Sequence, residues 1–223
     1  MSWRKIGLFC LNLAVTVNCA GQGASGSMKL SEDSTKVKIL YFDFVSLPET
    51  VQQAMREKAA KVYHQAGVDL EWAPCPTAEG TLAFYPNCTG YKDTTHLMLR
   101  ILPTARKGMK TDAKGEALLG ARIVNVFWDR IQDEATRFNV PIPDLLGQVV
   151  AHEIGHLLLG TNSHSSYGIM MGKWRLMDLG AIARGGISFT PQQCEQIQRE
   201  VKKRQHIESS AASVATKVAQ DLD

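Results

Sequence analysis

Residues 152–164 read His-Glu-Ile-Gly-His-Leu-Leu-Leu-Gly-Thr-Asn-Ser-His, and this stretch contains three of the six histidines in the 223-residue chain. On a helix, positions four apart lie about 40° apart around the axis and one turn apart along it. His152 and His156 are therefore expected to point two imidazoles at one place, as the ligands of a catalytic zinc ion do. Glu153 lies about 100° round the helix from His152, where its carboxylate can reach a zinc-bound water without binding the metal.

The flanking sequence predicts a helix that faces the core and carries this motif. The run Pro-Ile-Pro-Asp at 141–144 is typical of a helix start, because proline is tolerated in the first turn and an acidic residue suits the positive end of the helix dipole. Apolar residues then recur at helical spacing: Leu145, Leu146, Val149, Val150 and Ile154. Gly160 is a natural stop. An ordinary buried helix is the alternative, but two histidines and a glutamate are costly to bury without a metal or partners.

The third histidine needs a change of chain direction. If the helix continued past Gly160, His164 would lie about 12 Å further along the axis than His156 and could not share a metal with it. The turn-forming residues 161–163, Thr-Asn-Ser, allow the backbone to reverse and to bring His164 back. His164 is therefore the preferred third ligand. Asn162 and a downstream carboxylate such as Asp178 are the alternatives, and a neutral amide oxygen is a poorer zinc ligand than imidazole.

The stretch resembles the metzincin family of zinc peptidases, whose motif is H-E-x-x-H-x-x-G-x-x-H followed by a turn that contains methionine. Gly160 comes one residue later than in that motif and His164 two residues later, so Asn162 occupies the family spacing of the third ligand. Residues 168–171, Gly-Ile-Met-Met, resemble the family's Met-turn, with Met170 as its methionine. Met170 could otherwise be an ordinary core residue. Tyr167 is a candidate donor to the charge that develops on the substrate oxygen.

The N-terminal sequence suggests that the protein is exported. Arg4 and Lys5 precede an apolar stretch at 6–17 and then small residues, which is typical of a signal peptide cleaved after Ala20 or Ala24. The stretch is short for a transmembrane helix. We expect a signal peptide at 1–20, a flexible linker at 21–36, one catalytic domain at 37–206 and a disordered tail at 207–223. A secreted or periplasmic location follows, and a lipoprotein anchored through Cys19 is the less favoured alternative.

The charge of the chain bears on its binding partners, and its cysteines bear on disulfide formation. The 25 basic and 22 acidic residues give a net charge of +3. Loss of Arg4 and Lys5 with the leader leaves 23 against 22, or +1, and no basic stripe suggests nucleic acid. In an oxidising compartment, Cys75 and Cys88 are expected to close the loop between them as a disulfide. Cys194 is expected to be a buried free thiol.

The order of elements predicts an α/β (α+β) fold. We expect strands at residues 37–45, 68–72, 95–102 and 117–127, with a break of the last one at Gly120 as the alternative. Helices are expected at 48–65, 129–138 and from Pro191 after an N-cap at Thr190. Residues 103–115 are expected to form a mobile loop. The result is a single domain in which a mixed, twisted sheet packs on the motif helix. The metzincin resemblance implies a zincin-like layout, with residues 118–123 as the edge strand to which an extended peptide adds.

These features predict a secreted zinc-dependent metalloendopeptidase with Zn²⁺ as its cofactor and a polypeptide as its substrate. Glu153 would be the general base that takes a proton from a zinc-activated water and the general acid that protonates the leaving amine. We expect a monomer without a membrane span. The alternative is a secreted zinc-binding protein without peptidase activity that acts as a binding module. The retention of Glu153 argues against it, since a structural zinc site has no need of a general base.

Overall fold

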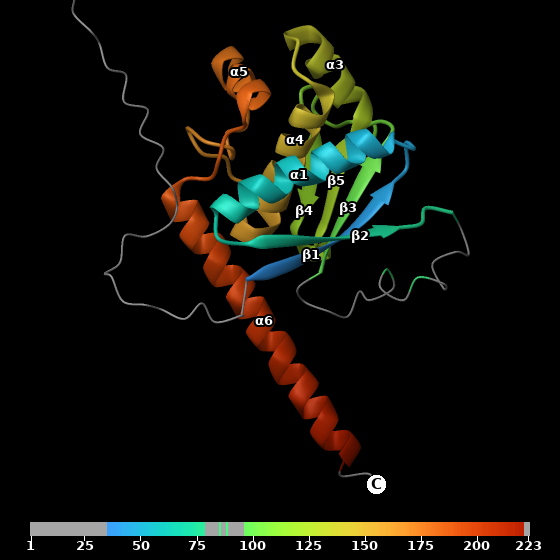
Figure 1. The fold of residues 1–223 in the computed structure, drawn as a ribbon, viewed down its shortest axis with the longest axis vertical. Helices are drawn as coiled ribbons and strands as arrows, with labels where there is room; N and C mark the ends of the chain where they lie inside the picture. Colours follow the sequence, from blue (N-terminus) through green and yellow to red (C-terminus); the bar gives the residue numbers. More distant parts are fainter. Residues whose placement is uncertain (1–34, 79–84, 86–87, 89–95, 221–223) are drawn as a thin grey trace, which may run out of the picture.

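The computed structural model describes residues 35–78, 85, 88 and 96–220 (Figure 1). The predicted signal peptide lies outside the described residues. The strands are β1 (Lys36–Asp43), β2 (Asp69–Cys75), β3 (Leu97–Leu102), β4 (Gly115–Leu118) and β5 (Ile123–Phe127). The helices are α1 (Glu49–Gln65), α3 (Trp128–Phe138), α4 (Ile142–Leu159), α5 (Leu176–Arg184) and α6 (Pro191–Gln220), and a 3₁₀ turn η2 (Leu119–Ala121) joins β4 to β5.

The five strands form one mixed sheet in the order β2-β1-β3-β5-β4. β1, β2, β3 and β5 are parallel, and β4 runs antiparallel to β5. Alternate residues of β3, Leu97, Leu99 and Ile101, are fully buried, as expected of a strand that turns one side to the core. The predicted mixed α/β domain is confirmed.

Helices α1 and α4 cover one face of this sheet and pack on each other (Figure 1). A Cβ atom at Gly147 of α4 would lie 2.8 Å from the carbonyl oxygen of Met55, so the glycine lets the two helices cross closely. Every residue of α4 from Leu145 to Leu159 is buried. The helix with the histidine motif is therefore the centre of the core, and its position against the sheet is fixed along its length.

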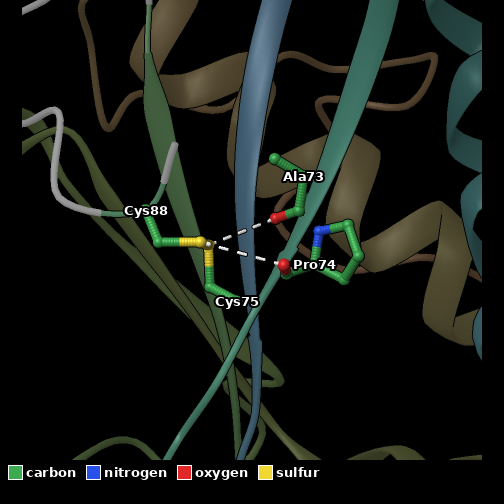
Figure 2. The surroundings of a disulfide bond; sticks show 4 residues. All are labelled: Ala73, Pro74, Cys75 and Cys88. Carbon is green, nitrogen blue, oxygen red and sulfur yellow. Dashed lines mark hydrogen bonds between the residues drawn. A yellow bond between two sulfur atoms is a disulfide. The ribbon is translucent and has the colours of Figure 1, made fainter. Parts of the chain in front are cut away.

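A smaller apolar cluster on β1 and β2 includes Leu40, Phe42 and the two cysteines of a disulfide, Cys75 and Cys88. The predicted Cys75–Cys88 bond is confirmed (Figure 2). The carbonyl oxygens of Ala73 and Pro74 lie 3.4 and 3.8 Å from its sulfurs; these are contacts, since a disulfide carries no S–H hydrogen. Cys194 is buried but disulfide-bonded, so the prediction of a free thiol is wrong.

The prediction that residues 118–123 form the edge strand is wrong. The edge is β4, Gly115–Leu118, which begins inside the predicted mobile loop, while Ile123 begins the inner strand β5. The chain reverses through η2, and Arg122 adopts a left-handed conformation with φ 54°. The sequence suggests a break at Gly120, which lies in η2, but the apolar run from 117 to 127 does not show that its two halves belong to antiparallel strands.

Helix α6 begins as predicted. The Thr190 hydroxyl accepts a hydrogen bond from the Gln193 N–H and the Gln193 side chain accepts one from the Thr190 N–H, which is a capping box. The helix runs to Gln220, through most of the segment expected to be a tail, and its second half extends beyond the body of the protein (Figure 1). No glycine or proline follows Pro191 to interrupt it. Among the described residues, no helix is long and apolar enough to cross a membrane.

Candidate metal centre

His152 and His156 stand one turn apart on the same side of α4, and both side chains are buried. Their Nε2 atoms face each other at 3.1 Å. Two ligands of a tetrahedral zinc ion, each about 2.0–2.1 Å from the metal, stand roughly 3.3 Å apart. The spacing of the two nitrogens is therefore close to that of a shared zinc ion.

The chain reverses directly after these residues. Helix α4 ends at Leu159, as predicted, and Gly160 adopts a left-handed conformation with φ 67°. The His164 ring then returns to lie 5.4 Å from the His152 ring and 5.0 Å from the His156 ring, measured between centroids. One ring nitrogen of each histidine lies within 4.8 Å of the others. The structure brings the three histidines together, and their assignment as metal ligands stays a prediction.

Backbone carbonyls orient two of the imidazoles. Nδ1 of His152 donates a hydrogen bond to the Ile169 carbonyl at 2.7 Å, and Nδ1 of His156 donates one to the Thr161 carbonyl at 2.8 Å. A carbonyl oxygen can only accept, so each Nδ1 carries the hydrogen and each Nε2 keeps its lone pair. This arrangement is the one that metal-ligating histidines adopt, and the donor set therefore fits zinc.

The predicted Met-turn lies under the helix. Gly168 has φ 77°, and the Met170 side chain is buried. A Cβ atom at Gly155, between the two histidines of α4, would lie 2.7 Å from the Met170 sulfur. Met170 therefore packs directly against the α4 backbone. On the open side, a Cβ at Gly172 would lie 2.9 Å from the His164 ring, so the chain after the turn also passes close to the third histidine.

Glu153 is buried beside the histidines, and β4 passes over it. A Cβ atom at Gly115 would lie 2.7 Å from Cγ of Glu153 and 2.8 Å from Oε1. Burial raises the pKa of Glu153 to about 8, the nearby carboxylate of Glu116 adds to the rise, and the cation of Lys114 opposes it. Without a metal, the Glu153 carboxyl group is therefore mostly protonated at pH 7.

The histidines have the opposite shift. Burial lowers the pKa of His152 to about 3, in spite of its bond to the Ile169 carbonyl, which favours the charged ring. Burial also lowers the pKa of His156 and of His164. All three imidazoles are consequently neutral at pH 7, which is the form that binds a metal.

The histidines and Glu153 open onto a cavity of about 610 Å³. The four residues of β4 line it, and so do Lys114, Asn162 and Trp174. Trp174 also packs edge-on against His152, with ring centroids 5.8 Å apart, and donates from Nε1 to the Ile169 carbonyl. Lys114 and Trp174 were not predicted from the sequence, since nothing in their local pattern distinguishes them from other lysines and tryptophans.

Two predicted residues do not reach this cluster. The Tyr167 side chain is largely exposed and lies outside the residues that line the cavity. The Asp178 carboxylate accepts hydrogen bonds from the backbone and side chain of Arg175 at the start of α5. Asp178 is thus engaged in capping a helix, while Asn162 stays near the histidines as part of the cavity wall.

Known structures have a similar fold. An archaemetzincin from Methanopyrus kandleri superposes with a TM-score of 0.50 at 16% identity, over 78% of this chain and 99% of the other. A zinc-dependent peptidase from Methanocorpusculum labreanum gives a TM-score of 0.48 at 17% identity, over 72% and 99%. No family model and no curated protein sequence matches the chain. The similarity to the archaemetzincin shows the fold alone. The chain therefore has the fold of an archaemetzincin.

Proposed function

We propose that the protein is a zinc-dependent metalloendopeptidase in which His152, His156 and His164 hold one zinc ion. The observation that carries this proposal is the pair of imidazoles turned by backbone carbonyls so that their free nitrogens face one point, with Glu153 buried beside them in an open cleft. A purely structural zinc site would close its fourth position with a protein ligand. The archaemetzincin fold supports the same conclusion.

Glu153 would move the proton in the reaction. Zinc bound at the histidines would supply a Lewis acid for the scissile carbonyl and for the attacking water. Glu153 would accept a proton from the water as its oxygen bonds to the carbonyl carbon, and would give that proton to the amine nitrogen as the C–N bond breaks. Its position under Gly115 places the carboxylate at the floor of the cleft.

Strand β4 is the proposed binding surface for the peptide. In the described sheet β4 has a neighbour on one side only, and all four of its residues line the cavity. An extended polypeptide could therefore add to this edge by main-chain hydrogen bonds, which hold a peptide without demanding particular side chains.

We further propose that the protein is exported, on the basis of the N-terminal sequence and the Cys75–Cys88 disulfide.

The substitution Glu153→Gln tests the proposal. The amide keeps the size of the carboxylate but cannot accept a proton at neutral pH, so cleavage of an unstructured protein should fall by about 10²–10⁴-fold. Zinc content should stay at the wild-type value, because Glu153 binds no metal. His156→Ala should lose zinc and activity together. Zinc binding without any cleavage by the wild type would instead support the binding-module alternative.

A further inference from the structure

Gln148 is a fully buried polar residue that the proposed chemistry does not use. It lies on α4 one turn before His152. Its Nε2 donates a hydrogen bond to the Ile187 carbonyl at 2.7 Å, and its Oε1 accepts one from the Ile187 N–H at 3.2 Å. One side chain thus satisfies both backbone groups of a residue 39 positions away, which fixes that residue in place.

The backbone conformation at Gly186 leaves room for the Gln148 side chain. Gly186 has φ 101°, a conformation that favours glycine, and a Cβ atom there would lie only 2.6 Å from Oε1 of Gln148. The segment from Gly186 to Thr190 joins α5 to α6 and packs against α4 through Phe189, whose ring would lie 2.9 Å from a Cβ at Gly155. Gln148 therefore holds a connection that lies directly under the metal centre.

That connection holds the Met-turn in its place. The Ser188 carbonyl accepts a hydrogen bond from the Ile169 N–H at 2.9 Å. A Cβ at Gly168 would also lie 2.9 Å from the Ser188 oxygen, so the two segments lie in close contact. The Ile169 carbonyl then accepts the Nδ1 hydrogen of His152. Hydrogen bonds and two short backbone segments consequently connect Gln148 to the His152 imidazole.

We propose that Gln148 is a positioning residue for the metal centre: it fixes the Ile187–Ser188 backbone, which fixes Ile169, whose carbonyl aims the His152 ring. The inference rests on the proposed function in taking His152 as a zinc ligand. Removing a group that orients a metal-ligating histidine typically weakens metal binding by about 10–100-fold. Gln148 touches neither the cavity nor the ligand nitrogens, so its effect passes through the Met-turn.

The variant Gln148→Met tests this role, since methionine has nearly the same length and makes neither hydrogen bond. Leu146→Ala is the matched control: it is fully buried on the same helix and lowers stability by leaving a cavity, without a bond to the Met-turn. Each protein is examined by hydrogen exchange of the Ile169 amide without metal, by zinc titration, and by the absorption spectrum of its cobalt(II) form, which reports ligand geometry.

In Gln148→Met, we expect the Ile169 amide to exchange about tenfold faster than in wild type, and the β3 amides to change less. The dissociation constant for zinc should rise about 10–100-fold, and the spectrum of the cobalt(II) form should shift. Leu146→Ala should raise exchange throughout the core and leave the zinc constant within about threefold of wild type. If Gln148→Met does not fold, Gly186→Ala disturbs the same contact from the other side and should give the same pattern.

Two outcomes would overturn the inference: zinc binding by Gln148→Met within about threefold of wild type, or equal weakening in Gln148→Met and Leu146→Ala. Failure of the proposed function is a separate result. If the wild type binds no zinc, the metalloendopeptidase proposal fails, and the hydrogen exchange of Ile169 in the metal-free proteins still decides whether Gln148 holds the Met-turn.

Discussion

The environment of Glu153 differs strongly from that of a free glutamate side chain. It lies on the buried helix α4, with β4 packed over it at Gly115 and the Glu116 carboxylate nearby. The pKa of Glu153 rises from its ordinary value of 4.5 to about 8 in the metal-free protein. A group whose folded pKa is raised binds more protons in the folded state than in the unfolded state between those two values.

The metal-free wild type should therefore lose stability, relative to Glu153→Gln, as pH rises from 4.5 to about 8. The lowered pKa of His152 gives the opposite slope between about 3 and 6.5, but that contribution is shared by both proteins and cancels in the comparison. Melting temperatures of the two proteins in a chelating buffer, measured across this pH range, test this prediction. Parallel pH profiles would show that Glu153 is not buried as described.

At the residue scale, the sequence predicts the site best where the spacing of residues along one helix determines how their side chains lie. His152, Glu153 and His156 share one helix, so their relative placement follows from helical geometry. The return of His164 was predictable only as far as the stop at Gly160 and the turn residues after it. The bond of His152 to Ile169 and the position of Gln148 depend on the path of the chain after α5, and no local pattern specifies that path.

At the scale of single elements, β4 is the strand on which the site depends. The close approach of its backbone to Glu153 requires that residue 115 have no side chain, because a Cβ there would also lie 2.9 Å from the Asn125 carbonyl oxygen. Neither β4 nor α4 can move away easily, since α4 is buried from Leu145 to Leu159 and β4 is hydrogen-bonded to β5.

We therefore predict that Gly115→Ala keeps its zinc but loses peptidase activity, by up to about 10²-fold, since a catalytic group displaced by about 1 Å can cost that much. Gly120→Ala is the control, because a Cβ at Gly120 meets no atom within 4 Å. Steady-state cleavage rates and zinc content of both variants test this. Full activity in Gly115→Ala would mean that Glu153 and β4 are not in close contact.

The elements themselves were predictable to different degrees. Helix α4 has strong signals at both ends, a proline-containing start and a glycine stop, and both boundaries follow the sequence. β4 has no such signal: its four residues follow a segment with lysines at 107, 110 and 114, and the apolar run begins only at Ala117. Which strand forms the edge depends on the order of strands in the sheet, which local composition does not determine.

For the whole molecule, the disulfide between Cys75 and Cys88 stabilises the face of the sheet away from the proposed metal centre. With a sequence separation of 13, loss of the bond in the double variant Cys75→Ala/Cys88→Ala should lower the free energy of unfolding by about 3 kcal/mol. Zinc affinity should not change, because α4 packs on the opposite face. Urea unfolding and zinc titration measure the two effects, and an unchanged unfolding midpoint would contradict the prediction.

The fold as a whole follows from the alternation of buried strands and helices, and the sequence predicts its class correctly. It does not predict that α6 continues to Gln220, because the polar residues after Lys202 suggest fraying, although none of them breaks a helix. Nor does it predict that Gln196 and Arg204 of α6 donate hydrogen bonds to the last carbonyls of α4, at Leu159 and Leu157. Those contacts join segments far apart in the chain.

The zinc content of the purified native protein, measured with two variants, tests the central claim most directly. We predict about one zinc ion per wild-type chain, loss of zinc affinity by orders of magnitude in His164→Ala, and near wild-type affinity in Asn162→Ala, because three neutral imidazoles form the site. A wild-type protein without zinc would contradict the account. So would the reverse order of the two variants, which would make Asn162 the third ligand.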